Sequence, residues 1–188
     1  MSTLEVNTID SVSGTSTLTL GSTNAGTIAL GSGDVQSNML YPAFHAKLSS
    51  SHSLVYNTAT KIQFNTEVFD TDSAYDHSSN YRFTVPSGKA GKYFIYYQLR
   101  ASATGTTWQF GRVQVYKNGS AFSDNAQNNG SSALHSSNFF NGTLTLDLSA
   151  SDYLEIYYTH ESSDNSNGSA TVGSPGEQCV FGGYRIGT

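Results

Sequence analysis

From residue 43 to the C-terminus, apolar and polar residues alternate in short runs separated by Gly, Asn, Ser and Asp. Alternation with a period of two places every second side chain on the same face of a β-strand. No helical period of useful length interrupts the runs. The pattern therefore predicts an antiparallel β-sandwich in which one face of each strand lines a shared core. The clearest inward series are Tyr93, Ile95, Tyr97 and Leu99; Leu144, Leu146 and Leu148; and Leu154, Ile156 and Tyr158.

The positions of turn residues divide this region into expected strands. The apolar positions change parity between Phe110 and Val113, and Gly111 is the expected place for a β-bulge that restores the inward set. Asn118-Gly119 predicts a type I′ hairpin turn. Gly142 continues an even-numbered apolar series, so we expect it inside a strand. The expected strands are 43–48, 60–65, 81–85, 92–101, 108–116, 139–148, 153–160 and 178–186.

Residues 1–38 differ from the rest because they contain no aromatic residue. The run Thr-Leu-Thr-Leu-Gly-Ser at 17–22 is echoed ten residues later by Thr-Ile-Ala-Leu-Gly-Ser at 27–32. The apolar side chains of this repeat are too few for a core within one chain, but three copies around a shared axis could bury them. They are Leu18, Leu20, Ile28 and Leu30. We therefore expect an attachment and stalk segment at 1–38 and a head at 39–188, with a flexible linker as the alternative for the first unit.

Charge and cysteine content narrow the classes of partner. Of the 188 residues, 12% are charged, against roughly 25% in an average globular protein. The net charge is −5, and the 9 basic residues form no cluster, so we expect neither nucleic-acid binding nor attraction to an anionic membrane. No apolar stretch approaches the ~18 residues of a membrane span, so no membrane insertion is expected. Cys179 is the only cysteine, and its apolar neighbours predict a small core residue.

Aromatic residues, an Asp and a Gly recur at set spacing through the middle of the chain, as Phe64-x5-Asp70-x4-Tyr75-x7-Phe83-x7-Gly91-x-Tyr93-x-Ile95-x-Tyr97. The chain closes on Cys179-Val180-Phe181-Gly182-Gly183-Tyr184-Arg185-Ile186. Together these motifs resemble the C1q/TNF-like head domain over about residues 42–187. The resemblance implies an all-β jelly-roll sandwich that forms homotrimers. It also places five aromatic residues in the core or the trimer contact, without dividing them between the two: Tyr93, Tyr97, Tyr158, Phe181 and Tyr184.

One acidic loop raises the question of a metal. Asp70, Asp72 and Asp76 lie close in sequence, and oxygen ligands at this density can hold Ca²⁺. The alternative is that Asp70 shapes an Asx-type turn. No other cofactor is expected. Neither a nucleophile motif nor a pair of catalytic carboxylates is evident, so we do not expect an enzyme.

Two long segments rich in Ser, Asn and Gly, at 121–138 and 161–177, are expected to be loops. Amide and hydroxyl groups beside an aromatic ring suit sugar binding, although the same composition is typical of any solvated loop. The candidate ligand residues are Phe122, Asn125, Asn128, His135, Asp164 and Asn165.

The N-terminal repeat resembles segments of phage tail fibres, where such units form an intertwined stalk of three chains. The first hypothesis is therefore a homotrimeric phage fibre in the virion, attached to other virion proteins through residues 1–38 and binding a host-surface glycan through its head. A second hypothesis is a virion decoration or cap protein that binds no receptor. A third is a bacterial C1q-like lectin.

Overall fold

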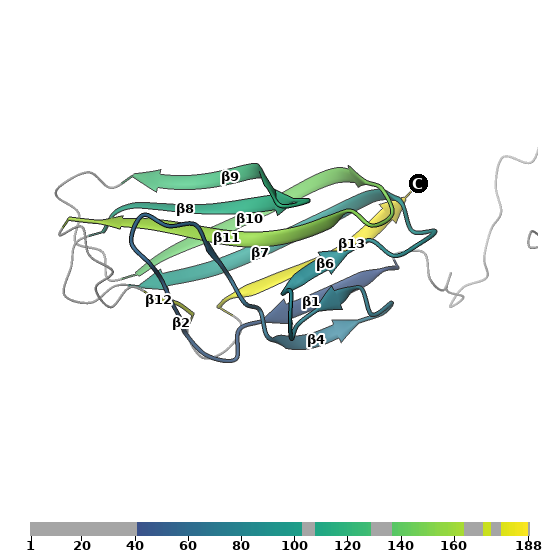
Figure 1. The fold of residues 1–188 in the computed structure, drawn as a ribbon, viewed down its shortest axis with the longest axis horizontal. Coiled ribbons are helices and arrows are strands. Elements are labelled where there is room, and N and C mark those ends of the chain that lie inside the picture. The colour runs from purple at the N-terminus through teal and green to yellow at the C-terminus, as the bar shows by residue number, and fades with distance from the viewer. Residues whose placement is uncertain (1–40, 103–107, 129–136, 164–170, 174–177, 188) are drawn as a thin grey trace, which may run out of the picture. The chain divides into compact units, whose positions relative to one another are not determined.

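The computed structural model describes residues 41–102, 108–128, 137–163, 171–173 and 178–187 (Figure 1). The predicted stalk core of Leu18, Leu20, Ile28 and Leu30 lies outside these residues, as do His135, Asp164 and Asn165. The strands are β1 (Ala43–Lys47), β2 (His52–Ser53), β3 (Thr60–Lys61), β4 (Thr66–Asp70), β5 (Tyr75–Asp76), β6 (Arg82–Thr84), β7 (Gly91–Ser102), β8 (Trp108–Lys117), β9 (Ser120–Asn128), β10 (Ser137–Leu148), β11 (Tyr153–Ser162), β12 (Thr171–Val172) and β13 (Val180–Gly187).

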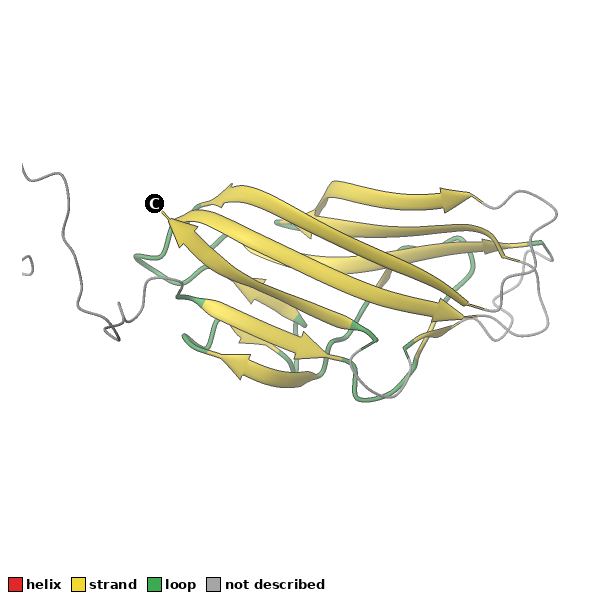
Figure 2. Ribbon diagram, turned by 180° about the vertical axis from the view of Figure 1, so that it is seen from behind, coloured by secondary structure: helices red, strands yellow, loops and turns green. Residues whose placement is uncertain are grey.

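The strands form two antiparallel sheets that face one another (Figures 1 and 2). Sheet A has the order β2-β12-β7-β13-β1-β4, with β10 also paired to β7. Sheet B has the order β5-β6-β11-β8-β9, with β3 also paired to β11. Over the described ranges Figure 2 shows strands and loops only, and no helix that could cross a membrane is found there. The predicted all-β sandwich is confirmed.

The core lies between the sheets and is rich in aromatic rings. Phe44 of β1 stacks on Phe83 of β6 at 4.5 Å between ring centroids, and it meets the edge of Phe181 of β13 at 5.0 Å. All three rings are fully buried. Each such side chain contributes about 1.5–3 kcal/mol of transfer free energy to folding. The contacts join three strands from both sheets, which fixes how the sheets are placed on one another.

The predicted type I′ turn at Asn118-Gly119 and the predicted position of Gly142 inside a strand are both confirmed. Asn118 and Gly119 both have positive φ, 54° and 80°, as a type I′ turn between β8 and β9 requires. The Asn118 side chain also donates to Asp152 Oδ1 at 2.7 Å and accepts from the Tyr153 backbone at 2.9 Å. Gly142 lies within β10, opposite Tyr97, where a β-carbon would overlap the tyrosine ring. Gly119 therefore allows the turn, and Gly142 allows the close approach of the Tyr97 ring to β10.

The predicted bulge at Gly111 is wrong. The register between β8 and β11 shifts between Glu161 and Ser162, so that Gln109 is the extra residue. Gly111 pairs regularly with His160 and points inward, where a β-carbon would come within 2.6 Å of the Phe140 ring. The parity change is present, but it lies between Trp108 and Gly111 rather than after Phe110, which is on the outward side, and Gln109 absorbs it.

The segment 121–138 is not one loop. Its first part belongs to β9, which pairs with β8 along its length and carries Phe122, Asn125 and Asn128. The segment lacks the apolar alternation of a half-buried strand because β9 is an edge strand. Two of its amide side chains instead hydrogen-bond the edge of sheet A: Asn125 donates to the Asn141 carbonyl at 3.0 Å and Gln127 to the Phe139 carbonyl at 3.2 Å.

Candidate functional site

A row of rings crosses the outer face of sheet A, on the side away from the core. Phe69 of β4 lies 5.9 Å from the His45 ring of β1, which lies 5.8 Å from Tyr96 of β7. Phe94 follows at 6.4 Å from Tyr96, and Tyr184 of β13 lies 5.4 Å from Phe94. We call these five residues the aromatic strip. Ring contacts of this kind contribute about 0.5–1.5 kcal/mol each beyond their buried area.

The strand register assembles the aromatic strip from four strands distant in sequence. His45 pairs with Phe69 on one side and with Gly182 on the other. Gly182 in turn pairs with Tyr96. Because Gly182 has no β-carbon, the Tyr96 ring lies over it and its hydroxyl meets His45 Nδ1 at 2.6 Å. Burial, followed by the neighbouring Tyr184, raises the pKa of the Tyr96 hydroxyl.

The same face carries exposed apolar side chains beside the strip. Phe69 is 48% exposed and Ile186 is 44% exposed, and at the β10 edge of the sheet Phe139 is 50% exposed. Large apolar side chains gathered on one face of a soluble domain mark a protein contact more often than a random surface does. The outer face of sheet A is therefore the candidate self-association surface.

Four of the five aromatic residues predicted for the core or the trimer contact lie in the core. Tyr93, Tyr97, Tyr158 and Phe181 are buried between the sheets, and Tyr184 belongs to the aromatic strip. Tyr93 donates to the Lys89 carbonyl at 2.6 Å, and burial raises its pKa to about 12.

The rest of the aromatic strip, Phe69, His45, Tyr96 and Phe94, was not predicted from sequence. A signal was present: the even positions of the run 92–101 include two aromatic residues, on the face opposite to the odd-numbered core series. An antiparallel strand with one solvated face usually alternates apolar and polar residues, so aromatic residues on the second face favour a contact there.

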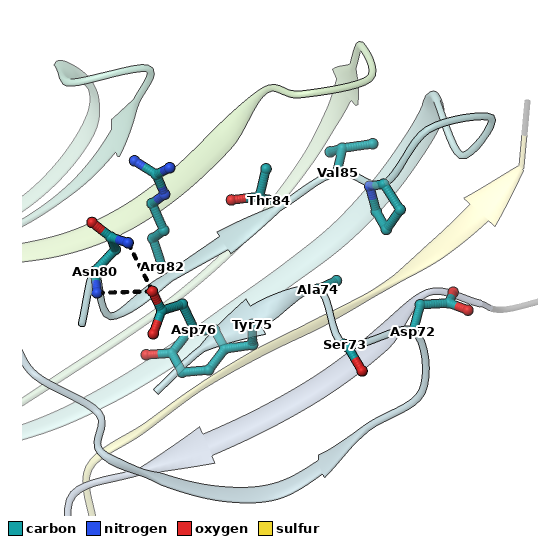
Figure 3. Close-up of a pocket in the computed structure, with 10 residues that line it drawn as sticks. Asp72, Ser73, Ala74, Tyr75, Asp76, Asn80, Arg82, Thr84 and Val85 are labelled. Atoms are coloured by element: carbon teal, nitrogen blue, oxygen red, sulfur yellow. Dashed lines mark hydrogen bonds between the residues drawn. The ribbon is translucent and has the colours of Figure 1, made fainter. Parts of the chain in front are cut away.

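The acidic loop uses most of its carboxylate oxygens within the chain. The Asp70 carboxylate accepts from the backbone N–H of Tyr75 at 2.7 Å and of Asp72 at 3.3 Å. These hydrogen bonds form the Asx-type turn that is the alternative to a calcium site. Asp76 accepts from the backbone of Ser79 at 2.9 Å and from Asn80 Nδ2 at 2.7 Å, as Figure 3 shows in part.

Backbone hydrogen bonds, from Ser79 first and then Ser78, hold the pKa of Asp76 well below its usual range. Asp72 lies apart from Asp76 in Figure 3, with Lys89 Nζ 4.0 Å from its carboxylate. In the described ranges no three metal-ligating side chains come together. Calcium binding by Asp70, Asp72 and Asp76 stays an untested prediction.

Cys179 is a core residue, as predicted from its neighbours. Its side chain is fully buried, and its sulfur accepts from the Arg100 backbone at 3.2 Å. Burial raises the pKa of the thiol, so the reactive thiolate is disfavoured.

Comparisons with known proteins agree with this architecture. A scan against protein-family models finds no match, and neither does a search of curated proteins. Among solved structures, the globular domain of zebrafish complement 1qA protein aligns with TM-score 0.51 and 14% identity, covering 77% of this chain and 97% of that one. The Eiger TNF of S. frugiperda aligns with TM-score 0.54 and 13% identity, covering 78% and 92%. Murine APRIL aligns with TM-score 0.52 and 11% identity, covering 76% and 97%. The fold is therefore the C1q/TNF-like jelly roll.

Proposed function

We propose that this chain is a homotrimeric phage fibre whose C1q/TNF-like head binds a glycan on the host surface. The observation that carries the trimer is the aromatic strip, which one chain leaves uncovered on the outer face of sheet A. Burying such a face against another copy of the chain gains transfer free energy without any further partner. The fold neighbours and the sequence resemblance support the same assembly.

The surfaces of one chain favour a ring of copies over a face-to-face pair. The aromatic strip runs over β4, β1, β13 and β7, whereas Phe139 lies exposed on β10, the strand at the edge of sheet A beyond β7. We propose that this edge of one copy packs against the strip of the next. Contact between two different patches is heterologous, and a heterologous contact that closes forms a ring. Three copies are the number that the C1q/TNF-like resemblance implies.

The virion assignment rests on residues 1–38. Their ten-residue repeat resembles phage fibre stalks, and the few apolar positions gain a core only when three chains share it. We propose that this segment joins other virion proteins and that the trimeric head sets the register of the stalk.

We propose binding rather than catalysis. Of the described carboxylates, Glu155 is buried in an ion pair with Lys61, and Asp76 is held ionised by backbone hydrogen bonds. An Asp76 held ionised in this way is poorly suited to act as a general acid near neutral pH. We expect no turnover in a sugar-cleavage assay on host polysaccharide.

Binding of the purified full chain to host cells and to a glycan array tests the attachment. Saturable binding supports a receptor-binding fibre. A trimer that binds neither supports the second candidate, a decoration or cap protein. Genomic neighbours that encode no capsid or tail protein would support the third, a bacterial lectin.

A further inference from the structure

The outer face of sheet B, opposite to the aromatic strip, carries a second group of tyrosines. Tyr153 and Tyr157 of β11 point outward between the inward residues Leu154, Ile156 and Tyr158. Tyr116 of β8 points to the same side, with its ring centroid 4.0 Å from that of Tyr157. We call Tyr116, Tyr153 and Tyr157 the tyrosine belt. All three rings are partly exposed, so each presents an aromatic surface to solvent.

Charged side chains hold the tyrosine belt in place. Glu155 lies between the tyrosines, is 4% exposed and forms an ion pair with Lys61 Nζ. The same ammonium group lies 5.8 Å from the centre of the Tyr157 ring and donates to the Asn80 carbonyl at 3.2 Å. Groups held this firmly lose little conformational entropy when a ligand binds.

A depression lies at each end of the tyrosine belt. One, of about 330 Å³, is lined by Asn80, Arg82 and Thr84 with the acidic loop (Figure 3). The Arg82 guanidinium carbon lies 4.2 Å from the centre of the Tyr153 ring, so this pocket adjoins the belt. Its volume is at the lower end of the ~300–1,000 Å³ of small-molecule sites.

The second depression, of about 210 Å³, lies across the sheet on β8 and β9. Gln114, Phe122 and Asp124 line it. Gln114 pairs with Tyr157 in the strand register and with Asp124 on its other side, so this pocket also adjoins the belt. The belt therefore joins two hollows across the width of sheet B.

The chemistry of this surface indicates its ligand. A sugar ring has a C–H face that stacks on an aromatic ring and a rim of hydroxyls that needs planar polar partners. The belt supplies the rings, and Arg82, Asn80 and Gln114 supply the planar groups. Its charged groups are Lys61 and Arg82 against Glu155, Asp124, Asp72 and Asp76, a negative balance, so a polyanion gains no net attraction. Two separated hollows suit a chain of sugars better than a single one.

We infer that the outer face of sheet B is a binding surface for an uncharged polysaccharide, with its chain lying along the tyrosine belt between the two pockets. The inference rests on the proposed glycan attachment and assigns it to a sheet face rather than to loops. It leaves sheet A for self-association, so three copies of the surface would act together in a trimer, with a gain in avidity.

The test uses the full chain on a printed array of neutral and acidic bacterial polysaccharides, followed by titration of the tightest one. Wild type should prefer a neutral polysaccharide. The variants Tyr116→Ala/Tyr157→Ala and Arg82→Ala should each bind it at least ten-fold more weakly, whereas Tyr41→Ala, a matched exposed tyrosine away from the belt, should bind like wild type. Circular dichroism and thermal melting establish that each variant is folded.

A second approach avoids loss of folding. The variants Asp124→Cys and Ser149→Cys are each labelled with a bulky maleimide. Residue 124 is exposed in the second pocket, and residue 149 is exposed in a turn elsewhere. Cys179 is buried and stays unlabelled. Label at 124 should block binding, and label at 149 should not. If wild type binds a polysaccharide and these changes leave the affinity unaffected, the tyrosine belt is not the binding surface, although the proposed glycan attachment stands. The same holds if wild type binds only acidic polysaccharides. If wild type binds none, both fail.

Discussion

The hydroxyl end of the Tyr96 ring lies over Gly182, and a β-carbon at position 182 would overlap it. This single contact places the tyrosine at the centre of the aromatic strip, within 2.6 Å of His45 Nδ1. The strip therefore depends on a glycine in β13 as much as on the rings themselves. In the closing Gly-Gly-Tyr motif, Gly182 leaves room for the Tyr96 ring on the outer face of sheet A, and Tyr184 contacts Phe94 on the same face.

Gly182→Ala should displace Tyr96 and destabilise the assembled protein. The new methyl group would also come within 2.9 Å of the Phe44 carbonyl oxygen, which cannot move without disturbing β1. Overpacking of this kind costs about 1–3 kcal/mol, visible as a lower thermal midpoint. Gly187→Ala is the matched control in the same strand, because a β-carbon there meets nothing within 4 Å. Equal midpoints for the two variants would count against the described packing.

Polar substitutions in the aromatic strip should weaken the trimer while leaving each head folded. Phe69→Ser and Tyr184→Ser remove apolar area that we assign to the contact, and each should cost about 1–2 kcal/mol of association free energy. That is roughly a five- to thirty-fold weaker association for each change, measured by sedimentation equilibrium. Val55→Ser, at an exposed residue of the β2–β3 loop, is the control. Unchanged association of the strip variants would place the contact elsewhere.

Removing Lys61 should leave the buried carboxylate of Glu155 without its ion-pair partner. The Lys61 side chain is 30% exposed and that of Glu155 is 5% exposed, so the loss should be about 2 kcal/mol, below the 3–5 kcal/mol typical of fully buried pairs. Lys61→Met should therefore lower the urea midpoint, and Lys61→Met/Glu155→Gln should recover most of the loss. A double variant no better than the single one would show that the pair does not set the stability there.

Acid should destabilise the head through His160. Its ring is 1% exposed, and neither nitrogen has a hydrogen-bond partner among the described residues. Burial lowers the pKa of His160 below its ordinary 6.5, so below pH 6.5 the unfolded chain binds more protons than the folded one. Stability therefore falls as the pH drops below 6.5, by at most about 1.4 kcal/mol per pH unit for one group.

Urea midpoints at pH 7.5 and pH 5.0, at one protein concentration, measure this loss. His160→Phe should shrink the difference between the two midpoints, whereas Val55→Ser, at an exposed side chain that does not titrate, should not. A difference that His160→Phe leaves intact would assign the acid sensitivity to another group, such as His52, whose pKa burial also lowers.

Calcium should leave the head unchanged. Asp70 and Asp76 already accept backbone N–H groups, and a cation would have to displace those hydrogen bonds. Millimolar Ca²⁺ and EDTA should therefore give the same thermal midpoint. A rise of several degrees with Ca²⁺, lost in Asp72→Asn, would establish the calcium site that the acidic loop first suggested.

The sequence was sufficient for the inward faces of the long strands, because period-two alternation reports burial directly. Ile95 and Leu154 illustrate it. Contacts that depend on register between distant strands were not accessible: His45 meets Tyr96 only because β1, β13 and β7 align as they do. Likewise β9 has too few apolar residues to predict a strand, and its edge is stabilised by amide side chains such as Asn125 instead.

The trimer is the claim on which the other proposals depend, and the mass of the full chain in solution tests it most directly. Sedimentation equilibrium at micromolar protein should report about 60 kDa, three times the 20.1 kDa of one chain. A folded species of 20.1 kDa that persists as the concentration rises would contradict the account.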